Sequence, residues 1–473
     1  MFKKSLIASA ITVVVAMSSG AAVAETGSGF VDGASMDMGI MYYGRQRNAK
    51  GDRYTNADGK IGINDNRDIK VSTLGLNANL KSGWYKDWFG MDVSAFSNID
   101  LMGGHGYGQS ETLYYDVDKG KERSSSRLGR ARFRMKFGDE KMGAFFKAGI
   151  TDIHAGTIGT SSGANGHAYR GAEAKGHFEN FSLTYGYADR FMNDWNDELL
   201  EMTNSWHQNN TENKAGHGEV VKYIHSLGGR YEGENGWMEL AAGEGKGYRK
   251  NAHFAGSYGF GLSDDTRLTL TTYYQTAKYQ DDKAGKGMIV DTRGKAEQEY
   301  TWSSSAVLTH GGWSFVGGYG QTHAPDSGEY QLRLTAWGNS DHRNFIQTAS
   351  TLDDFLWDGQ KVARAGMSYN FDKQGIPGLT LGVNAFYAWD AYNNRGTSTE
   401  NRDGKMKALD FQIMYSFQSE PLKGLWVGVF PSFLRVSDTA RSEDTVNKDA
   451  KRNIDKSSRN DLKVIATYTL KVF

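Results

Sequence analysis

The clearest alternation of polar and apolar residues lies at 130–137, where basic and apolar side chains take turns. Successive side chains of an extended strand point to opposite faces, so this stretch separates into one basic face and one apolar face. A helix would mix the two sets. In a water-soluble sheet the apolar face would cover a core, whereas in a membrane barrel it would contact lipid and the cations would line a hydrated lumen. The basic set is Arg130, Arg132, Arg134 and Lys136.

The same period of two recurs along most of the chain. It is clear at 36–47, at 74–81 and at 89–98, and it returns between nearly all later turn signals. Alternation over this many residues indicates half-buried strands. We count about 18 strands of about 10 to 13 residues from this pattern.

The connections between these strands alternate in length. Tight turns on one rim and long loops on the other are typical of outer-membrane barrels, and soluble sandwiches do not sort loop length by end. The sequence therefore predicts an all-β, transmembrane antiparallel barrel with short periplasmic turns and long extracellular loops. Short turns are expected near 84–88, 138–140, 179–180, 233–236, 263–265, 311–312, 372–378 and 419–424. Long connections are expected at 48–69, 100–126, 152–168, 192–219, 278–296, 324–360, 391–404 and 438–460.

The N-terminus has the pattern of a secretory signal. Lys3 and Lys4 precede an apolar run at 6–17, and Ala22-Val23-Ala24 forms a small-residue cleavage site. We expect residues 1–24 to be removed and residues 25–473 to form the barrel in the bacterial outer membrane. The interior of so many strands cannot be filled by side chains, so an open or loop-constricted channel is expected.

Composition agrees with a barrel without proving one. The chain has 59 Gly, 25 Tyr, 23 Phe and 11 Trp against 4 Pro and no Cys. Its formal net charge is zero, which gives no reason to expect a nucleic-acid partner. The aromatic residues suit lipid-facing strands and interfacial girdles. Trp84, Trp88, Trp237, Trp313 and Trp426 lie beside short turns and Trp389 beside a long loop, where such girdles would lie.

Candidate functional residues are the charged residues that alternation places on the lumen face of the predicted strands. The cations at 130–136 would extend along roughly 20 Å of the lumen wall. They would either bind an anionic or hydroxyl-rich solute one after another as it moves through, or only keep the wall hydrated. Arg45, Arg47 and Arg364 fall on lumen-facing positions of other strands. Asp152, Glu173 and Asp410 would either form an opposing acidic wall or pair with the basic residues.

Tryptophans in the long connections are a second candidate set. Trp337 and Trp357, with Trp195 and Trp206, would either stack on sugar faces as a solute enters or pack loop against loop. The segment around Asn56, Asp58 and Asp65 only partly matches a calcium loop, since Tyr54 stands where the first carboxylate belongs.

Other signals are negative or local. Gly243, Gly245 and Gly247 lie in a strand and indicate close backbone packing rather than a nucleotide cradle, which needs a following helix. No hydrolase or metal-ligand motif is present, so we expect neither an enzyme nor a cofactor or metal site. Pro431 within a strand requires a bulge, and Phe473 is out of phase with the apolar residues before it, which a register slip would reconcile.

Several stretches together resemble the OprD-type outer-membrane porins, and they are most similar to the chitoporin branch of that family. The resemblance implies an 18-stranded, usually monomeric channel with inward-folded loops and a basic ladder on one wall. The sequence does not exclude association of three barrels. The resemblance places Arg130, Arg132 and Arg134 in ladder-like positions and makes 152–168 and 324–360 constricting loops. The connection 152–168 departs from the family because it is rich in small residues at 159–164 and lacks the prolines that many relatives carry. The stretches are 39–47, 76–80 with 89–96, 169–174, 223–228 and 376–391.

These observations predict a selective porin for passive diffusion of small hydrophilic solutes. The resemblance favours chitooligosaccharides, whereas a basic ladder by itself favours carboxylate-bearing solutes such as amino acids. The alternative from another class is an outer-membrane enzyme whose barrel is only an anchor, which usually needs fewer strands.

Overall fold

A computed structural model of the protein describes thirteen segments of the chain. These are residues 29–50, 53–55, 61–63, 69–102, 112–116, 121–159, 167–192, 197–202, 220–280, 298–324, 346–391, 404–437 and 458–473. The predicted signal sequence lies outside them, so cleavage after Ala24 stays a prediction.

Eighteen long antiparallel strands form the wall of a closed barrel. The continuous sheet has 19 strands, of which the two-residue β12 only extends the end of β11. The wall strands are β1 (Ser35–Lys50), β4 (Ile69–Lys81), β5 (Phe89–Asp100), β8 (Ser125–Gly138), β9 (Met142–Thr151), β10 (Ala168–Phe178), β11 (Phe181–Met192), β13 (Ile224–Gly233), β14 (Gly236–Gly245), β15 (Arg249–Ser263), β16 (Thr266–Tyr279), β17 (Gln298–His310), β18 (Trp313–His323), β19 (Lys361–Asn370), β20 (Leu379–Ala391), β21 (Gly404–Ser416), β22 (Trp426–Val436) and β23 (Ser458–Lys471). The small elements are β2 (Arg53–Thr55), β3 (Ile61–Ile63), β6 (Tyr114–Asp116), β7 (Lys121–Arg123), β12 (Leu200–Glu201) and the 3₁₀ turn η3 (Asp372–Gln374).

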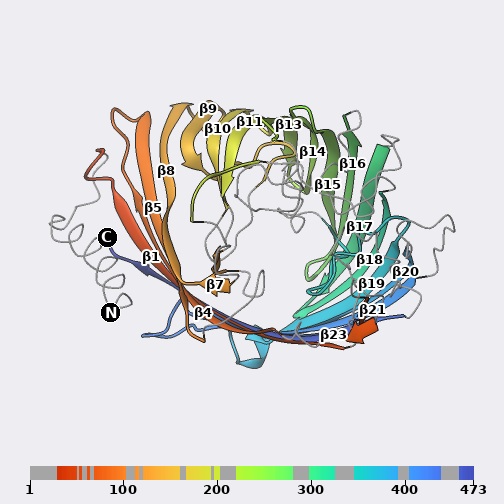
Figure 1. The fold of residues 1–473 in the computed structure, drawn as a ribbon. Helices are drawn as coiled ribbons and strands as arrows, with labels where there is room; N and C mark the ends of the chain where they lie inside the picture. The colour runs from red at the N-terminus through yellow and green to blue at the C-terminus, as the bar shows by residue number, and fades with distance from the viewer. Residues whose placement is uncertain are drawn as a thin grey trace.

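The barrel closes through its first strand. β1 pairs with β4 on one side and with the last strand, β23, on the other, in register from Asp37 with Lys471 to Lys50 with Ser458. Figure 1 shows the strands as a ring with β7 inside it. This places β7 in the lumen, where the neighbouring Thr112 also hydrogen-bonds the inward-facing Thr73 at 3.1 Å. The predicted fold class is therefore confirmed.

Connection length divides by rim as expected. Each predicted short turn joins two neighbouring wall strands, and the longer connections lie at the other end, apart from the three residues 246–248 between β14 and β15. In the described part of the chain, no helix is long and apolar enough to cross a membrane.

Burial is inverted relative to a soluble protein, and this decides between the two interpretations of the alternating strands. Large apolar side chains on the outer face are exposed: Phe133 by 37%, Leu227 by 49% and Ile413 by 45%. Polar side chains on the inner face, such as Asp92 and Asp410, are buried instead. A soluble sheet would show the reverse. The outer face therefore suits lipid, and the inner face suits a hydrated lumen.

The tryptophans beside the short turns divide between the two faces. Trp88 and Trp313 are exposed on the outer face, as predicted. Trp84 and Trp237 face the lumen, because their ring centroids lie 4.2 Å and 4.0 Å from the guanidinium carbons of Arg134 and Arg230, both inward-facing residues. The predicted girdle role is wrong for these two, because a residue near a turn can join either face of its strand.

The two irregular positions are accommodated without a change of register. Around Pro431 the pairing of β22 with β21 lapses between Ser432 and Val429 and resumes in the same register, so no bulge forms. Proline has no N–H to donate, which accounts for the gap. The register of β23 is likewise constant, and Phe473 lies beyond the strand end.

Candidate functional site: a charged wall inside the barrel

Four neighbouring strands, β5, β8, β9 and β10, bring charged residues of opposite sign together on the lumen wall. Asp92 on β5 lies directly opposite Arg132 on β8. Arg134 lies opposite Lys147 on β9, and Lys147 lies opposite Glu173 on β10. Residues directly opposite in antiparallel strands have adjacent side chains, so strand register alone builds this network.

Asp92 connects two of the predicted ladder cations. Its Oδ2 atom accepts a hydrogen bond from Arg132 Nε at 2.8 Å, and its Oδ1 atom accepts one from Arg134 Nε at 2.8 Å. The Asp92 side chain is only 5% exposed. Arg134 Nη2 also donates to the carbonyl of Ser82 at 2.6 Å, and Lys136 Nζ lies 4.5 Å from the Trp84 ring centroid. Arg134 and Lys136, which lie at the short-turn end of the basic row, are thus held in position.

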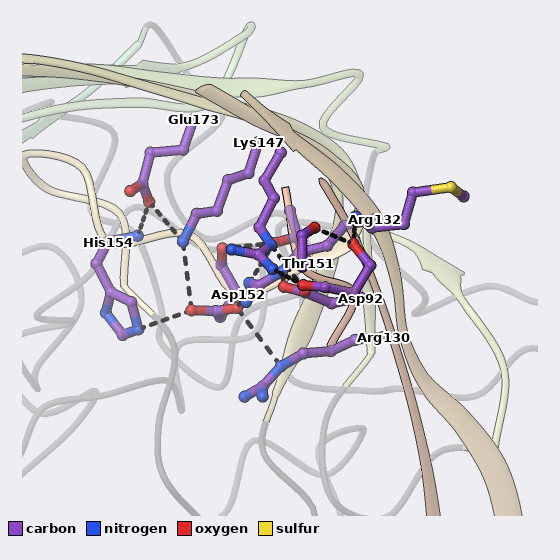
Figure 2. A network of polar contacts seen from close by, with 12 residues as sticks. Asp92, Arg130, Arg132, Lys147, Thr151, Asp152, His154 and Glu173 are labelled. Carbon is purple, nitrogen blue, oxygen red and sulfur yellow. Dashed lines mark hydrogen bonds and ion pairs between the residues drawn. The ribbon is translucent and has the colours of Figure 1, made fainter. Parts of the chain in front are cut away.

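Asp152, just beyond the end of β9, is the centre of a second network, nearer to the long-connection rim (Figure 2). It pairs with Arg132 Nη1, with Arg130 Nε at 3.4 Å and with Lys147 Nζ at 3.3 Å. Lys147 Nζ in turn lies 3.3 Å from Glu173 Oε2, which also accepts a hydrogen bond from the backbone N–H of His154 at 2.6 Å. The start of this connection is therefore attached to the charged wall.

The surrounding charges keep Asp152 ionised. Burial by itself would raise the pKa of its carboxyl, but Lys147, Arg132 and Arg130 outweigh burial and hold the pKa below its usual value of 3.8. Because the folded-state pKa is lowered, the ionised carboxylate stabilises the wall at neutral pH. This contribution is lost only as the pH falls below about 3.8.

A pH titration of ion selectivity checks this assignment. We expect the selectivity difference between His154→Gln and the double variant His154→Gln/Asp152→Asn to stay constant from about pH 7 to pH 5 and to disappear only in stronger acid. Replacing His154 removes the imidazole whose Nε2 atom lies 3.7 Å from Asp152 Oδ2, so the comparison isolates the carboxyl. Reversal potentials in asymmetric KCl give the measurement, and a difference already lost at pH 5 would contradict the lowered pKa.

The wall has a small net charge. Five cations, Arg130, Arg132, Arg134, Lys136 and Lys147, share it with the three carboxylates Asp92, Asp152 and Glu173, so 5 − 3 leaves +2. Asp152 and Glu173 lie among the basic residues and not across the lumen. Of the two alternatives for these acids, the structure supports pairing and contradicts an opposing acidic wall.

A β-bulge turns Arg127, which is not among the five cations counted above, to the inner face, where strict alternation from Arg130 would put it on the outer face. The register between β5 and β8 shifts between Ser94 and Ala95, where Arg130 and Leu128 are the partners and Gly129 is the extra residue. Leu128 is 46% exposed on the outer face, whereas Arg127 is buried. Arg127 therefore belongs to the inner face although its number is odd. A one-residue insertion inverts every position before it.

The connection after β9 lies against the inner wall, as the family resemblance implied. Thr157 N–H donates to Ser226 Oγ on β13 at 2.8 Å. Glycine makes room for it: a Cβ atom at Gly186 would come within 2.8 Å of both Ala155 Cβ and Ile153 Cγ2. Gly243 likewise lies against Thr157, which confirms close packing at that position. Residues 152–159 are described, and the remainder of the expected loop is not.

A second segment, residues 346–360, covers the inner face across the barrel. Arg364 on β19 donates from Nη1 to the carbonyl of Gln347 at 2.9 Å and from Nη2 to Asn384 Oδ1 at 2.7 Å. Asp410 on β21 accepts a hydrogen bond from Thr351 N–H at 2.8 Å. Arg364 and Asp410 thus anchor a loop on the side opposite the charged wall, which their positions in the sequence did not reveal.

The remaining candidates have different environments from those expected. Arg45 and Arg47 both pair with Asp461, at 2.7 Å and 2.8 Å, and the Arg45 side chain is only 1% exposed. A solute cannot reach Arg45 there. Trp357 is buried, which contradicts sugar stacking and supports loop packing. Trp195, Trp206, Trp337, Asn56, Asp58 and Asp65 lie outside the described residues.

Comparison with known proteins identifies the family. The sequence model of the OprD family, outer membrane porins, matches residues 28–472. The chain belongs to the OprD family. Its relatives include the chitoporin of Escherichia coli K12, 26% identical over 450 residues and 89% of each chain, and porin D of Pseudomonas aeruginosa, 24% identical over 420 residues, 84% of this chain and 85% of that one. Acinetobacter baumannii OccAB1 shares the fold with a TM-score of 0.74 at 15% identity, over 96% of this chain and all of that one.

Membership in this family fixes the broad role of the porin. It is an outer-membrane channel of Gram-negative bacteria through which small solutes pass, and its relatives are channels rather than enzymes. Within the described residues, no group of His, Cys, Asp and Glu could hold a metal ion.

Proposed function

We propose that this porin admits chitooligosaccharides, with the charged wall as part of the solute path. The observation that carries the proposal is the partial neutralisation of the wall, in which three carboxylates hold five cations. Arg132 and Arg134 are held by Asp92, so they present N–H groups in fixed positions with little net charge. A neutral chain of hydroxyl and acetamido groups needs hydrogen-bond partners more than it needs an attracting field.

Two further observations support the same solute class. A relative over 89% of the chain is named for chitin transport. The lumen-facing rings of Trp84 and Trp237 lie at the short-turn end, and indole faces suit the apolar faces of sugar rings. The path would then offer polar contacts on the wall and aromatic contacts near the periplasmic mouth.

Bilayer recordings with matched sugars test the proposal. We expect chitohexaose to interrupt the current of single channels at concentrations where maltohexaose, equally long but without acetamido groups, has little effect. Equal block by the two sugars would contradict specificity for chitin fragments while leaving a general sugar channel. The absence of block by both would contradict a sugar path.

Carboxylate-bearing solutes are the second candidate. The net charge of the wall favours them, and Arg130 is 30% exposed with its Nε atom 3.4 Å from Asp152. An arginine at this exposure is able to bind an incoming carboxylate. Current block or flux with glutamate, and none with chitohexaose, would make this candidate the better one.

A further inference from the structure

The outer face of the barrel carries cations just above its apolar band. On β21, Lys405 and Lys407 are exposed and share the face of Leu409, which continues the lipid-facing row. On β22, Arg435 is exposed and shares the face of Phe433. All three cations lie at the long-connection rim, which faces outside in outer-membrane barrels. They therefore point outward at the level of the outer-leaflet headgroups.

Several of these cations lie directly opposite one another. Lys407 pairs across strands with Arg435, and Lys250 on β15 with Lys278 on β16. Like charges directly opposite in antiparallel strands destabilise a sheet. On its other side Lys250 lies directly opposite Glu244 on β14, so a carboxylate is adjacent to that pair. Within the described part of the chain, the pair Lys407/Arg435 has no carboxylate partner, and Arg435 Nη1 donates only to backbone carbonyls, those of Leu434 at 2.9 Å and Arg459 at 3.2 Å.

A third pair shows what such an arrangement requires. Arg170 on β10 lies directly opposite Arg190 on β11, again on the outer face. Here protein carboxylates neutralise the cations: Arg170 pairs with Asp189 at 2.6 Å, and Arg190 pairs with Glu201 at 2.9 Å. The pair Lys407/Arg435 has the same geometry without such carboxylates, so an anion from outside the chain would complete it.

Among the described residues, the opposite rim has no outward-facing pair of cations. Near the short turns the outer face of the strands is apolar, with Met142 64%, Phe178 59% and Phe181 49% exposed. The cations there, such as Lys373 and Lys423, lie in the turns themselves. Paired outward cations thus belong to the rim that meets the outer leaflet, where lipids carry phosphate groups.

We propose that the cation pair Lys407/Arg435 binds a phosphate group of an outer-leaflet lipid headgroup. One phosphate between two cations replaces repulsion by two charge-assisted hydrogen bonds. Lipid is the source rather than free phosphate because the exposed apolar residues Leu409 and Phe433 lie directly below the pair. Tyr387 is 40% exposed, and its ring centroid lies 5.8 Å from Lys407 Nζ, which is the interfacial arrangement of an aromatic beneath a headgroup contact.

Binding of lipid A to the purified full-length porin in detergent tests the assignment. The probes are bisphosphorylated lipid A and the same lipid without phosphates, and the variant is Lys407→Gln/Arg435→Gln. Two surface cations lost should weaken binding of the phosphorylated lipid at that site by about thirtyfold, and Lys407→Gln by itself by about fivefold. The control Lys373→Gln/Lys423→Gln removes the same charge at the other end of this group of strands and should leave binding unchanged.

Thermal unfolding without and with lipid A gives a second measurement. Without lipid A, Lys407→Gln/Arg435→Gln should be at least as stable as the wild type, because repulsion is relieved. With lipid A, the wild type should gain more in Tm than the variant. Equal binding by variant and wild type, equal binding of the two lipids, or equal stabilisation by inorganic phosphate would each overturn the proposal. None of these outcomes depends on which solute crosses the lumen.

Discussion

Replacing Gly186 by leucine should increase the conductance of single channels, because the new side chain occupies the place of the inner loop. The three heavy atoms nearest to a Cβ at Gly186 belong to this loop, with Ala155 Cβ and Ile153 Cγ2 at 2.8 Å and Ile158 Cδ1 at 3.7 Å. Overpacking of this kind costs about 1–3 kcal/mol. That strain shifts the balance between docked and undocked loop by roughly 5- to 150-fold.

Conductance histograms in planar bilayers measure this effect. The hydrogen bond from Thr157 N–H to Ser226 Oγ opposes undocking, but a single such bond contributes only about 0.5–1.5 kcal/mol. The matched control is Gly317→Leu, a strand glycine on the outer face where an added Cβ meets nothing within 4 Å. Unchanged conductance in Gly186→Leu, in a barrel that still folds, would show that residues 152–159 do not limit the pore.

Replacing Asp152 by asparagine should make the channel prefer anions more strongly. The net charge of the wall rises from +2 to +3, because the other cations and carboxylates stay in place. One unit charge about 5 Å from a passing ion in a water-like medium changes its energy by about 0.8 kcal/mol. Removing the negative charge favours chloride and disfavours potassium by this amount each, so we expect the chloride-to-potassium permeability ratio to rise by about sixteenfold.

The control for Asp152→Asn is Asp139→Asn in the short turn after β8. Asp139 accepts hydrogen bonds from Lys141 N–H at 2.8 Å and Met142 N–H at 3.0 Å, and these two contacts lower the pKa of its carboxyl. It is an ionised acid outside the wall, so its loss should leave the permeability ratio unchanged. A shift of equal size in both variants would show that selectivity follows total charge and not the wall.

The partial neutralisation of the wall changes how the basic row of β8 should be understood. A row of free cations would attract any anion and slow its release. Held by Asp92 and Asp152, the same arginines offer donors in fixed positions, with their side chains 15–30% exposed. Such a surface recognises hydroxyl and amide groups by geometry, which connects the wall to the proposed sugar path.

Much of the fold could be predicted from the sequence because its cause is local. A strand in a barrel wall meets lipid on one side and water on the other, so it must alternate with a period of two wherever it lies. The alternation at 130–137 therefore placed four cations on the lumen face without any knowledge of neighbouring strands. Turn residues marked the short connections for the same reason, since a tight turn depends only on the residues within it.

Tertiary structure decided everything that depends on which strand lies beside which. Asp92 and Lys147 became part of the charged wall through register, and a bulge at Gly129 turned Arg127 to the inner face. Asp410 on the opposite side was placed by residues 346–360, which return to the inner face of the barrel. The sequence by itself determined a barrel with a basic row on its inner face. Whether those charges are free or neutralised was set by non-local pairing, because electrostatic energy depends on distance in space and not on separation along the chain.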